Sequence, residues 1–297
     1  MRNSIVVLTP VYEDLDSLKI LANKLYEEYQ KQLYLVVVDD CSKKHPISKE
    51  NLGVSNLKGE IITLRKNVGH QIAIAIGLNH INKNLKEFSE VVIMDSDGED
   101  RPDSIKDLKS TLNEKKTDIV VSSRKSRQNS LYFKILYSLY KILFSYLTGH
   151  RINFGNFMIL NRNGLSKFLE IKDIYIHIAA SVLISKATYN VKPIDRGSRY
   201  RGESKMNLYN LINHAIRSFA VFDKIVFKRI LIIIVVSSLF LIGSTYFSRP
   251  DLIFISSFFL LIHLIFYKYI IIQKKRLYVF HSTFSSLSTI IGKISKI

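Results

Sequence analysis

Short apolar runs alternate with longer amphipathic segments along the first 125 residues of the chain. The short runs are rich in Val and Ile and have the length of β-strands, and the longer segments carry apolar residues at helical spacing. We expect strands at 4–9, 33–40, 61–64, 90–95 and 118–123, and helices at 15–29 and 71–81. This alternation predicts an α/β fold, with a mostly parallel sheet covered by helices on both faces.

The helical segments that follow residue 130 are more apolar than those before it. The segment 131–149 is rich in aromatic and aliphatic residues, and 209–229 is an amphipathic segment that leads directly into a charge-free stretch. Apolar helices of this kind, flanked by lysine, can lie along a membrane interface. An ordinary core helix explains 131–149 equally well, whereas it explains 209–229 less well.

Two nearly uncharged stretches, 230–247 and 252–272, come next. Each is close to the roughly 20 apolar residues with which a helix crosses a bilayer. The polar turn 248–251 lies between them, so we expect a transmembrane hairpin. Buried core helices of a soluble protein seldom run this long with so few polar residues, which disfavours that alternative.

Basic residues flank both stretches, at Lys224, Lys228 and Arg229 before the first and at 274–276 after the second. By the positive-inside rule both flanks lie in the cytosol, and Arg249 in the turn is a weaker contrary signal. We therefore expect a multi-pass protein of the inner (plasma) membrane with its N-terminal domain in the cytosol. The expected parts are a cytosolic domain, a juxtamembrane helix, two spans and a basic cytosolic tail without an assigned role, at 1–208, 209–229, 230–272 and 273–297.

Composition narrows the choice of partner. The 43 Lys and Arg residues exceed the 25 Asp and Glu residues by 18, which suits nucleic acid, a phosphorylated substrate or lipid headgroups. The basic residues are dispersed and no nucleic-acid motif accompanies them, so we do not expect nucleic acid as a partner. The single cysteine, Cys41, cannot form an internal disulfide and fits a reducing cytosol. The N-terminus does not have the pattern of a signal peptide, so export is not expected.

Polar residues at the ends of the expected strands carry the candidate chemistry. The strand 90–95 delivers Asp95 and Asp97, and two such carboxylates can share Mg²⁺ or Mn²⁺ that also binds a diphosphate. Considered by itself, the pair Asp95 and Asp97 would usually be part of a solvated turn. Asp39 and Asp40, considered by themselves, would likewise be turn or helix-capping residues. In an open α/β sheet, however, ligands bind in the crevice at the carboxyl ends of the strands.

Two further polar segments belong to this set. TPVYED at residues 9–14 ends the first strand, and RKNVG at 65–69 opens a helix whose N-terminus can receive a phosphate. Four polar strand ends in one alternating unit argue for a nucleotide-diphosphate site better than any one of them does. A basic membrane scaffold without enzymatic activity would not need them. We interpret His70 and His177 as capping or packing residues, because a lone histidine more often has that role.

With these segments in this order and spacing, the chain resembles glycosyltransferase family 2, in the branch that contains dolichyl-phosphate mannose synthase and the bacterial polyprenyl-phosphate glycosyltransferases. The resemblance runs from about residue 4 to residue 222 and extends to the two spans. It implies a GT-A type, Rossmann-like fold and a UDP- or GDP-sugar donor. It also implies donor-binding roles at all four strand ends, for Pro10, Tyr12, Glu13, Asp39, Asp40, Asn67, Gly69, Asp95, Ser96 and Asp97.

The resemblance also implies individual roles. Asp39 faces the nucleoside and Asp40 the diphosphate, and Cys41 stands where the family has Gly. Asp95 and Asp97 hold the metal, Mg²⁺ or Mn²⁺, and together with Arg124 they are the expected catalytic residues. The segments SSRKSR and RYRGESK are similar to those that hold the acceptor phosphate, which suggests this role for Arg124, Arg127, Arg199, Ser204 and Lys205. Without the resemblance, RYRGESK would be interpreted as a solvated charged loop.

The function expected from the sequence is a membrane-bound, inverting transfer of a sugar from a nucleotide-sugar donor to a polyprenyl phosphate. The anionic acceptor oxygen attacks the anomeric carbon directly and needs no strong general base, so Asn156 can stand where many family members have Asp. The alternative acceptor is a hydroxyl of a lipid-linked saccharide or glycolipid in cell-surface polysaccharide synthesis, which requires a base such as Asp97 or Asp100. The sequence leaves open whether the chain forms a homo-oligomer.

Overall fold

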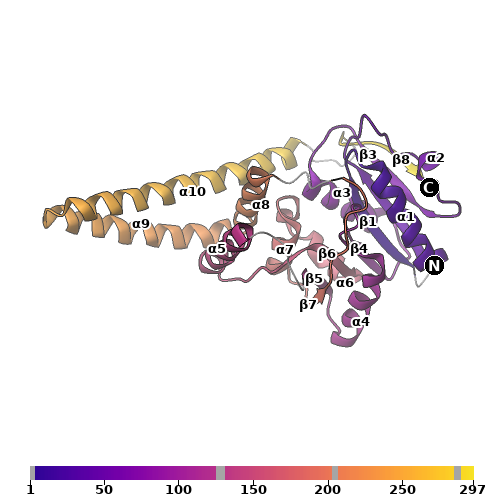
Figure 1. The fold of residues 1–297 in the computed structure, drawn as a ribbon, viewed down its shortest axis with the longest axis horizontal. Helices are drawn as coiled ribbons and strands as arrows, with labels where there is room; N and C mark the ends of the chain where they lie inside the picture. The colour runs from indigo at the N-terminus through magenta and orange to yellow at the C-terminus, as the bar shows by residue number, and fades with distance from the viewer. Residues whose placement is uncertain (1–3, 125–130, 203–206, 284–288) are drawn as a thin grey trace. The chain divides into compact units, whose positions relative to one another are not determined.

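The computed structural model describes residues 4–124, 131–202, 207–283 and 289–297, and the chain divides into two compact units (Figure 1). The first unit consists of Met1–Gln128, Asn153–Lys205 and Phe284–Ile297, and the second of Asn129–Ile152 and Met206–Thr283. The division differs from the expected boundary at residue 208 in two ways. The apolar segment after residue 130 belongs to the second unit, and the C-terminal residues belong to the first.

One eight-stranded sheet forms the centre of the first unit, in the order β7-β5-β6-β4-β1-β2-β3-β8. Its strands are β1 (Ile5–Val11), β2 (Leu33–Asp39), β3 (Lys58–Leu64), β4 (Glu90–Ile93), β5 (Ile119–Arg124), β6 (Phe154–Asn161), β7 (Tyr189–Ile194) and β8 (Ile291–Lys296). The pairs β1–β2, β1–β4, β2–β3 and β5–β7 are parallel, whereas β6 and β8 run antiparallel to their neighbours. The expected α/β sheet, mostly parallel, is confirmed.

Helices cover both faces of this sheet, as its apolar strands require. The helices of the first unit are α1 (Leu15–Tyr29), α2 (Lys49–Leu52), α3 (His70–Asn84), α4 (Ile105–Lys115), α6 (Arg162–Leu169) and α7 (Ile178–Ile184). Val7 and Val37 share a buried core with Leu18 of α1. On the opposite face, α3 approaches β1 so closely that a Cβ on Gly77 would lie 2.3 Å from the side chain of Leu8.

Local capping explains where two of these helices begin. Asp14 accepts a hydrogen bond from the N–H of Ser17 (3.3 Å) at the start of α1. His177 Nδ1 accepts from the N–H of Ala180 (3.1 Å) at the start of α7, so the capping interpretation of His177 is confirmed. Three short 3₁₀ turns complete the connections, at Gln30–Gln32, Pro102–Ser104 and Lys172–Tyr175.

The order of the strands indicates that a crevice for ligand binding is expected at the carboxyl ends of β1 and β4. Both neighbours of β1 are parallel to it, with Ile5 in register with Leu33 of β2 and with Glu90 of β4. The chain passes from β1 to β2 and β3 on one side and then returns to β4 on the other. Such a reversal is the switch point at which open α/β sheets bind ligands.

The second unit is helical and contains α5 (Leu131–Thr148), α8 (Leu208–Ala220), α9 (Asp223–Tyr246) and α10 (Pro250–Thr283). In Figure 1, α9 and α10 form a long antiparallel pair. Two segments within them, Asp223–Tyr246 and Pro250–Lys275, are long and apolar enough to cross a membrane. The single helix expected over 209–229 is two helices, because α8 ends at Ala220 and α9 begins at Asp223.

The C-terminal residues differ most from their expected structure. The segment 273–297 was expected to be a basic tail without a role, but α10 continues to Thr283 and residues 291–296 form β8. This strand pairs antiparallel with β3. Its sequence, IGKISK, is short and carries two lysines, so its apolar pattern is too weak to indicate a strand by itself.

Candidate functional site

The two carboxylates at the end of β2 organise the loops around the crevice. Asp39 is 1% exposed, and its Oδ1 accepts from the N–H of Ser42 (2.9 Å). Asp40 is 3% exposed, and its two oxygen atoms accept from the N–H groups of Val68 (2.7 Å) and Gly69 (2.9 Å). Asp40 therefore holds the turn that contains the expected donor residues Asn67 and Gly69.

Glu13, after β1, holds the loop that follows β2. Its carboxylate accepts from the N–H groups of Lys43 (2.7 Å), Lys44 (3.1 Å) and His45 (3.1 Å). The hydrogen bond from Lys43 is the largest cause that lowers the pKa of Glu13. Of the other residues expected here, Pro10 is buried within β1, whereas the side chain of Tyr12 is 47% exposed. The ring of Tyr12 is therefore accessible to solvent.

The acidic segment 95–100 after β4 is a compact turn held by its own carboxylates. Asp97 Oδ1 accepts from the N–H of Glu99 (2.9 Å), and Asp100 Oδ2 accepts from the N–H of Asp95 (2.9 Å). Ser96 is buried within the turn. Asp95 Oδ1 is buried and accepts no hydrogen bond from any residue that the structure describes.

Residues 195–200, which follow β7, close over this acidic turn. The N–H of Tyr200 donates to the carbonyl of Asp97 (2.8 Å), and the N–H of Gly197 donates to the carbonyl of Glu99 (2.9 Å). Gly98 has a φ of +93°, and a Cβ there would lie 2.7 Å from the ring of Tyr200. Glycine at position 98 therefore satisfies both the backbone conformation and the close approach of the ring.

Two arginines of the same segment form ion pairs with the acidic turn. Arg199 Nη2 lies 2.8 Å from Asp97 Oδ2, and its Nε lies 3.2 Å from Glu99 Oε1. Arg196 forms an ion pair with Glu99. Arg199, expected to bind an acceptor phosphate, thus lies directly beside the expected metal ligand Asp97. Any phosphate bound by Arg199 in this arrangement would lie next to the acidic turn.

His70, at the start of α3, connects the acidic turn with β6. His70 Nε2 lies 3.4 Å from Asp95 Oδ1 and 3.0 Å from the side-chain amide nitrogen of Asn156. The carbonyl oxygen of that amide is buried and has no hydrogen-bond partner among the described residues. His70 was expected to be a capping or packing residue, and its ring contacts both the acidic turn and β6.

Burial and mutual repulsion raise the pKa of several of these carboxyls. Burial and then the charge of Asp95 raise the pKa of Asp97, and the same two causes raise that of Asp100 to about 8. Burial raises the pKa of Asp40 to about 6, against the hydrogen bonds from Val68 and Gly69, which lower it. The crevice thus concentrates negative charge that the two arginines balance only in part.

The acidic turn fits a hard divalent cation that is held only partly by the protein. No cluster of three or more His, Cys, Asp or Glu side chains in the described part of the chain has the geometry of a complete metal site. Asp95 nevertheless offers a buried oxygen atom without a hydrogen bond, and Asp97 lies two residues away in the same turn. Mg²⁺ commonly binds through one or two carboxylates and takes its other ligands from phosphates and water.

The remaining expected residues are less tightly placed. Arg124 ends β5 and is exposed. Arg127, Ser204 and Lys205 lie outside the described residues. The sequence did not single out Arg196, Glu99 or Tyr200 as site residues, although Glu99 lies inside the acidic segment and Arg196 and Tyr200 flank Arg199. The available signal was their position in the sequence: Glu99 is a further acidic residue beside Asp97, and Arg196 is a further basic residue near Arg199.

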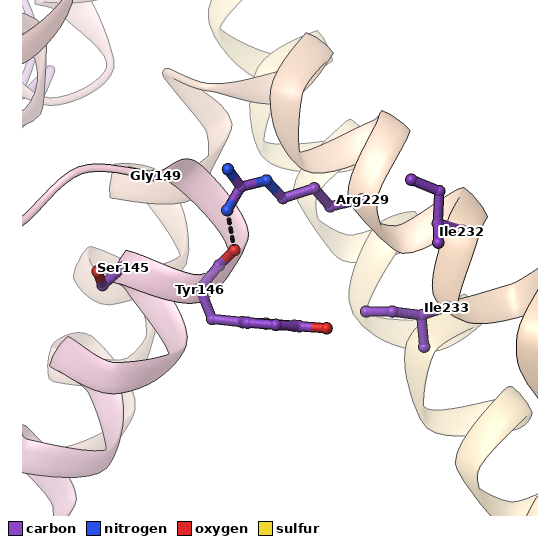
Figure 2. A pocket seen from close by; sticks show the side chains of 6 residues that line it. All are labelled: Ser145, Tyr146, Gly149, Arg229, Ile232 and Ile233. Atoms are coloured by element: carbon purple, nitrogen blue, oxygen red, sulfur yellow. Dashed lines mark hydrogen bonds between the residues drawn. The ribbon is translucent and has the colours of Figure 1, made fainter.

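In the second unit, α5 and α9 border an open pocket of about 550 Å³ lined by Ser145, Tyr146, Gly149, Arg229, Ile232 and Ile233 (Figure 2). The guanidinium of Arg229 donates to the carbonyl of Tyr146, near the end of α5, where helical carbonyls lack partners within the helix. Arg229 is also the last charged residue before the charge-free stretch of α9. The pocket therefore has a cationic rim and an apolar wall.

Comparison with known proteins places this geometry in a family. Residues 6–231 match the model of the family described as Glycosyl transferase family 2. The chain is 28% identical over 216 residues to undecaprenyl-phosphate 4-deoxy-4-formamido-L-arabinose transferase of Edwardsiella ictaluri, an alignment that covers 70% of this chain and 64% of that protein. The chain thus spans slightly less than two thirds of that relative. It is also 25% identical to the uncharacterized glycosyltransferase sll0501 of Synechocystis, over 73% of this chain and 68% of that one.

Solved structures agree on the fold. Glucosyl-3-phosphoglycerate synthase from Mycobacterium tuberculosis, crystallised with Mn²⁺ and UDP-glucose, has a TM-score of 0.53 and 13% identity, over 75% of this chain and 80% of that one. Mannosyl-3-phosphoglycerate synthase from Rubrobacter xylanophilus has a TM-score of 0.50 and 14% identity, over 74% and 72%. The expected GT-A type fold is therefore confirmed.

Proposed function

This chain belongs to glycosyltransferase family 2, and we propose that it transfers a sugar from a nucleotide-sugar donor to a polyprenyl phosphate at a membrane. The observation that carries the proposal is the juxtaposition of Arg199 with Asp97, 2.8 Å apart, at the switch point of the sheet. A carboxylate that holds a diphosphate through a metal and a cation that binds a phosphate are the two groups that this reaction requires. A relative that is 28% identical is named for a transfer that involves undecaprenyl phosphate.

Asp95 and Asp97 are the residues that would hold a divalent cation, Mg²⁺ or Mn²⁺. Such a cation supplies Lewis-acid stabilisation of the departing diphosphate. Asp100 supports this arrangement, because its carboxylate accepts a hydrogen bond from the N–H of Asp95 (2.9 Å). The donor's nucleoside side is bounded by Tyr12 and by the loops that Glu13, Asp39 and Asp40 hold in place.

The acceptor proposed here needs no deprotonation, because a phosphate monoester is already anionic at neutral pH. Its oxygen attacks the anomeric carbon as the nucleoside diphosphate departs, which inverts the anomeric centre. Arg124 and Arg199 are proposed to bind the acceptor phosphate, with Arg127, Ser204 and Lys205 as further candidates on the same segments. Asn156, which contacts His70 (3.0 Å), cannot act as a base, and a phosphate acceptor requires none there.

A hydroxyl acceptor is less well supported by the same geometry. It would require a general base, and the expected candidates were Asp97 and Asp100. Asp97 is engaged by Arg199 and by the N–H of Glu99, and Asp100 by the N–H of Asp95. A hydroxyl acceptor would therefore have to share a carboxylate that already has the metal-binding role proposed for Asp97 or the backbone contact made by Asp100.

The exposed apolar surface of α9 and α10 supports membrane insertion. Only 11% of the most apolar window of each helix is buried, and Phe240 and Phe254 are 51% and 73% exposed. Burying one such side chain away from water is worth about 1.5–3 kcal/mol, so a pair of long helices with this surface requires an apolar environment. The pocket beside Arg229, with its cationic rim and isoleucine wall, suits a lipid with an anionic head (Figure 2).

The connectivity of the sheet supports a hairpin. Strand β7 precedes α9 in the chain and β8 follows α10, yet both belong to one sheet. If α9 and α10 cross the bilayer, they must therefore cross it as a pair and return to the same side. The basic residues on both flanks favour the cytosolic side of an inner membrane for the sheet.

The proposal is tested with purified full-length protein, labelled UDP- and GDP-sugars, Mn²⁺, and two acceptors offered separately: undecaprenyl phosphate and a lipid-linked saccharide. We expect label to enter undecaprenyl phosphate from at least one donor. Label that enters only the saccharide would favour the hydroxyl alternative, and no transfer from any donor would contradict both.

A further inference from the structure

The last eight residues of the chain form an integral part of the sheet. Strand β8 pairs antiparallel with β3, from Lys296 opposite Glu60 to Ile291 opposite Leu64. Ile290, just before the strand, is 2% exposed, and the N–H of Ile297 donates to the carbonyl of Gly59 (2.9 Å). This segment is therefore fixed along the whole edge of β3, although both long apolar helices precede it in the chain.

A bulge in β8 brings its backbone close to the end of β3. Thr63 pairs with Lys293 and Leu64 pairs with Ile291, so Gly292 has no partner residue across the ladder. A Cβ on Gly292 would lie 3.2 Å from both the carbonyl oxygen of Thr63 and Cγ of Arg65. A bulge of this kind bends the strand and redirects its neighbours, and glycine permits the close approach.

The bulge directs two carbonyls of the C-terminal segment toward Arg65. The N–H of Arg65 donates to the carbonyl of Ile290 (2.9 Å), and its Nε donates to the carbonyl of Ile291 (3.3 Å). The carbonyl of Arg65 accepts a weak hydrogen bond from Cys41 Sγ (3.5 Å) in the loop after β2. Arg65 therefore connects the C-terminal segment with the loop that carries Asp39 and Asp40.

The same short stretch is held at its other end by Asp40. Its carboxylate accepts from the N–H groups of Val68 (2.7 Å) and Gly69 (2.9 Å), directly before α3. The turn 65–69 is thus fixed on one side by the C-terminal segment and on the other by a buried carboxylate. Asn67 lies between the two attachments and is exposed.

We propose that β8 and the residue before it position the turn 65–69 for the donor nucleotide, with Arg65 as the positioning residue. This inference rests on the proposed function, because it assigns the C-terminal segment to the same donor site. Arg65 acts through the turn and touches no reacting atom. One consequence concerns biosynthesis: the donor site is complete only after α9, α10 and the last eight residues have been made, so a chain that ends earlier lacks part of that site.

The test measures binding of UDP and of GDP, each with Mn²⁺, by calorimetry on full-length protein in detergent. The variants are Arg65→Ala, Arg65→Lys and a chain that stops after Thr289. The matched control is Lys58→Ala, which removes an exposed basic side chain from the opposite end of β3. We expect Arg65→Ala and the truncation to weaken nucleotide binding about five- to tenfold, since each loses one or more net hydrogen bonds. Lys58→Ala should bind like wild type.

Two further readouts separate positioning from a general loss of structure. A peptide of residues 289–297 should restore nucleotide binding to the truncated chain, and Arg65→Lys should bind more tightly than Arg65→Ala. In turnover assays, KM for the donor should rise while kcat changes less. A truncated chain without a thermal unfolding transition is not folded, and in that case the positioning role is tested by Arg65→Ala and Arg65→Lys.

Arg65→Ala that binds nucleotide like wild type would overturn the inference, and so would a folded truncated chain that binds like wild type. A wild-type chain that binds neither UDP nor GDP would contradict the proposed function itself, and the positioning role with it. Wild-type binding combined with unaffected variants would leave the proposed function intact and remove only the role of β8.

Discussion

Arg199 Nη2 lies 2.8 Å from Asp97 Oδ2, which joins the segment after β7 to the acidic turn after β4. The contact is reinforced by Arg199 Nε, 3.2 Å from Glu99 Oε1. The arginine and the two carboxylates come from parts of the chain about one hundred residues apart, and the sheet brings them together. This relationship places Arg199, which is proposed to bind a phosphate, beside the carboxylates proposed to hold a metal and a diphosphate.

Replacing Arg199 should therefore impair the chemical step more than the fold. We expect Arg199→Ala to lower kcat/KM about 10- to 100-fold, since it removes two charge-assisted contacts at the site of developing charge. Arg199→Lys should lose less, because it keeps the charge but not the forked geometry. Steady-state assays with varied donor and acceptor measure both. Equal activity of all three proteins would exclude a functional role for this side chain.

Asp95 and Asp97 should be required for metal-dependent turnover. We expect Asp95→Asn and Asp97→Asn each to reduce kcat by about 10²–10³-fold, the scale of losing one preorganised electrostatic group. Treatment with a chelator should abolish wild-type activity, and Mn²⁺ or Mg²⁺ should restore it. The exposed residue Asp107 on α4 supplies the control, Asp107→Asn, which should respond to metal like wild type. Full activity of the Asp95 and Asp97 variants in chelator would contradict the metal assignment.

Donor binding should weaken as the pH falls through about 6. Burial raises the pKa of Asp40 to about 6 from its ordinary 3.8. Above that pH the carboxylate accepts from both Val68 and Gly69, and below it the protonated group loses one acceptor. Nucleotide affinity measured between pH 5 and 8 should show this acid limb in wild type and not in Asp40→Asn, which should bind weakly throughout. If Asp40→Asn showed the same fall in affinity at acid pH, that fall would be due to the ionisation of another group.

Ionisation of Asp40 should affect the free energy of unfolding in the opposite direction from nucleotide affinity. The folded chain holds the proton of Asp40 more tightly than the unfolded chain, whose pKa is 3.8. The contribution of this group to the free energy of unfolding therefore falls as the pH rises from about 4 to about 6, and is constant above that. Denaturant titrations of wild type and Asp40→Asn at several pH values would separate this effect from nucleotide binding.

The proposed membrane hairpin predicts which residues a membrane-impermeant maleimide can reach. In a Cys41→Ser background, Ser248→Cys in the turn between α9 and α10 should be labelled on intact cells. Lys293→Cys in β8 and Lys58→Cys in β3 should be labelled only after permeabilisation, because both lie in one sheet. Different accessibility for Lys293→Cys and Lys58→Cys would contradict a hairpin.

Local patterns were sufficient to predict β1 to β5 of the eight-stranded sheet, whereas β6 and β7 were not among the expected strands. The Val- and Ile-rich runs of β1 and β2 are continuous apolar stretches, and the polar residues after them, Glu13, Asp39 and Asp40, hold the neighbouring loops. The helix 15–29 was predicted with its observed bounds because its apolar spacing and its cap at Asp14 are both local. Such features depend on neighbours a few residues away, which the sequence displays directly.

Long-range pairing was beyond the same reasoning. Arg65 and Ile291 are separated by 226 residues, and β8 is too short and basic to indicate a strand. His70 seemed to be an ordinary helix-start residue until the sheet brought Asp95 and Asn156 to it. Asp40 and Asp100 each accept hydrogen bonds from backbone N–H groups of a folded loop. Which N–H groups lie within reach depends on the fold, so the sequence alone did not indicate these roles.

The central claim is that a phosphate oxygen of a polyprenyl lipid accepts the sugar, and ³¹P NMR of the lipid product tests it most directly. Wild-type protein with Mn²⁺, undecaprenyl phosphate and the accepted nucleotide-sugar should convert the lipid phosphorus from a monoester to a diester, and Asp97→Asn should not. A lipid phosphorus that remains a monoester while nucleoside diphosphate is released and sugar appears on another acceptor would contradict the account.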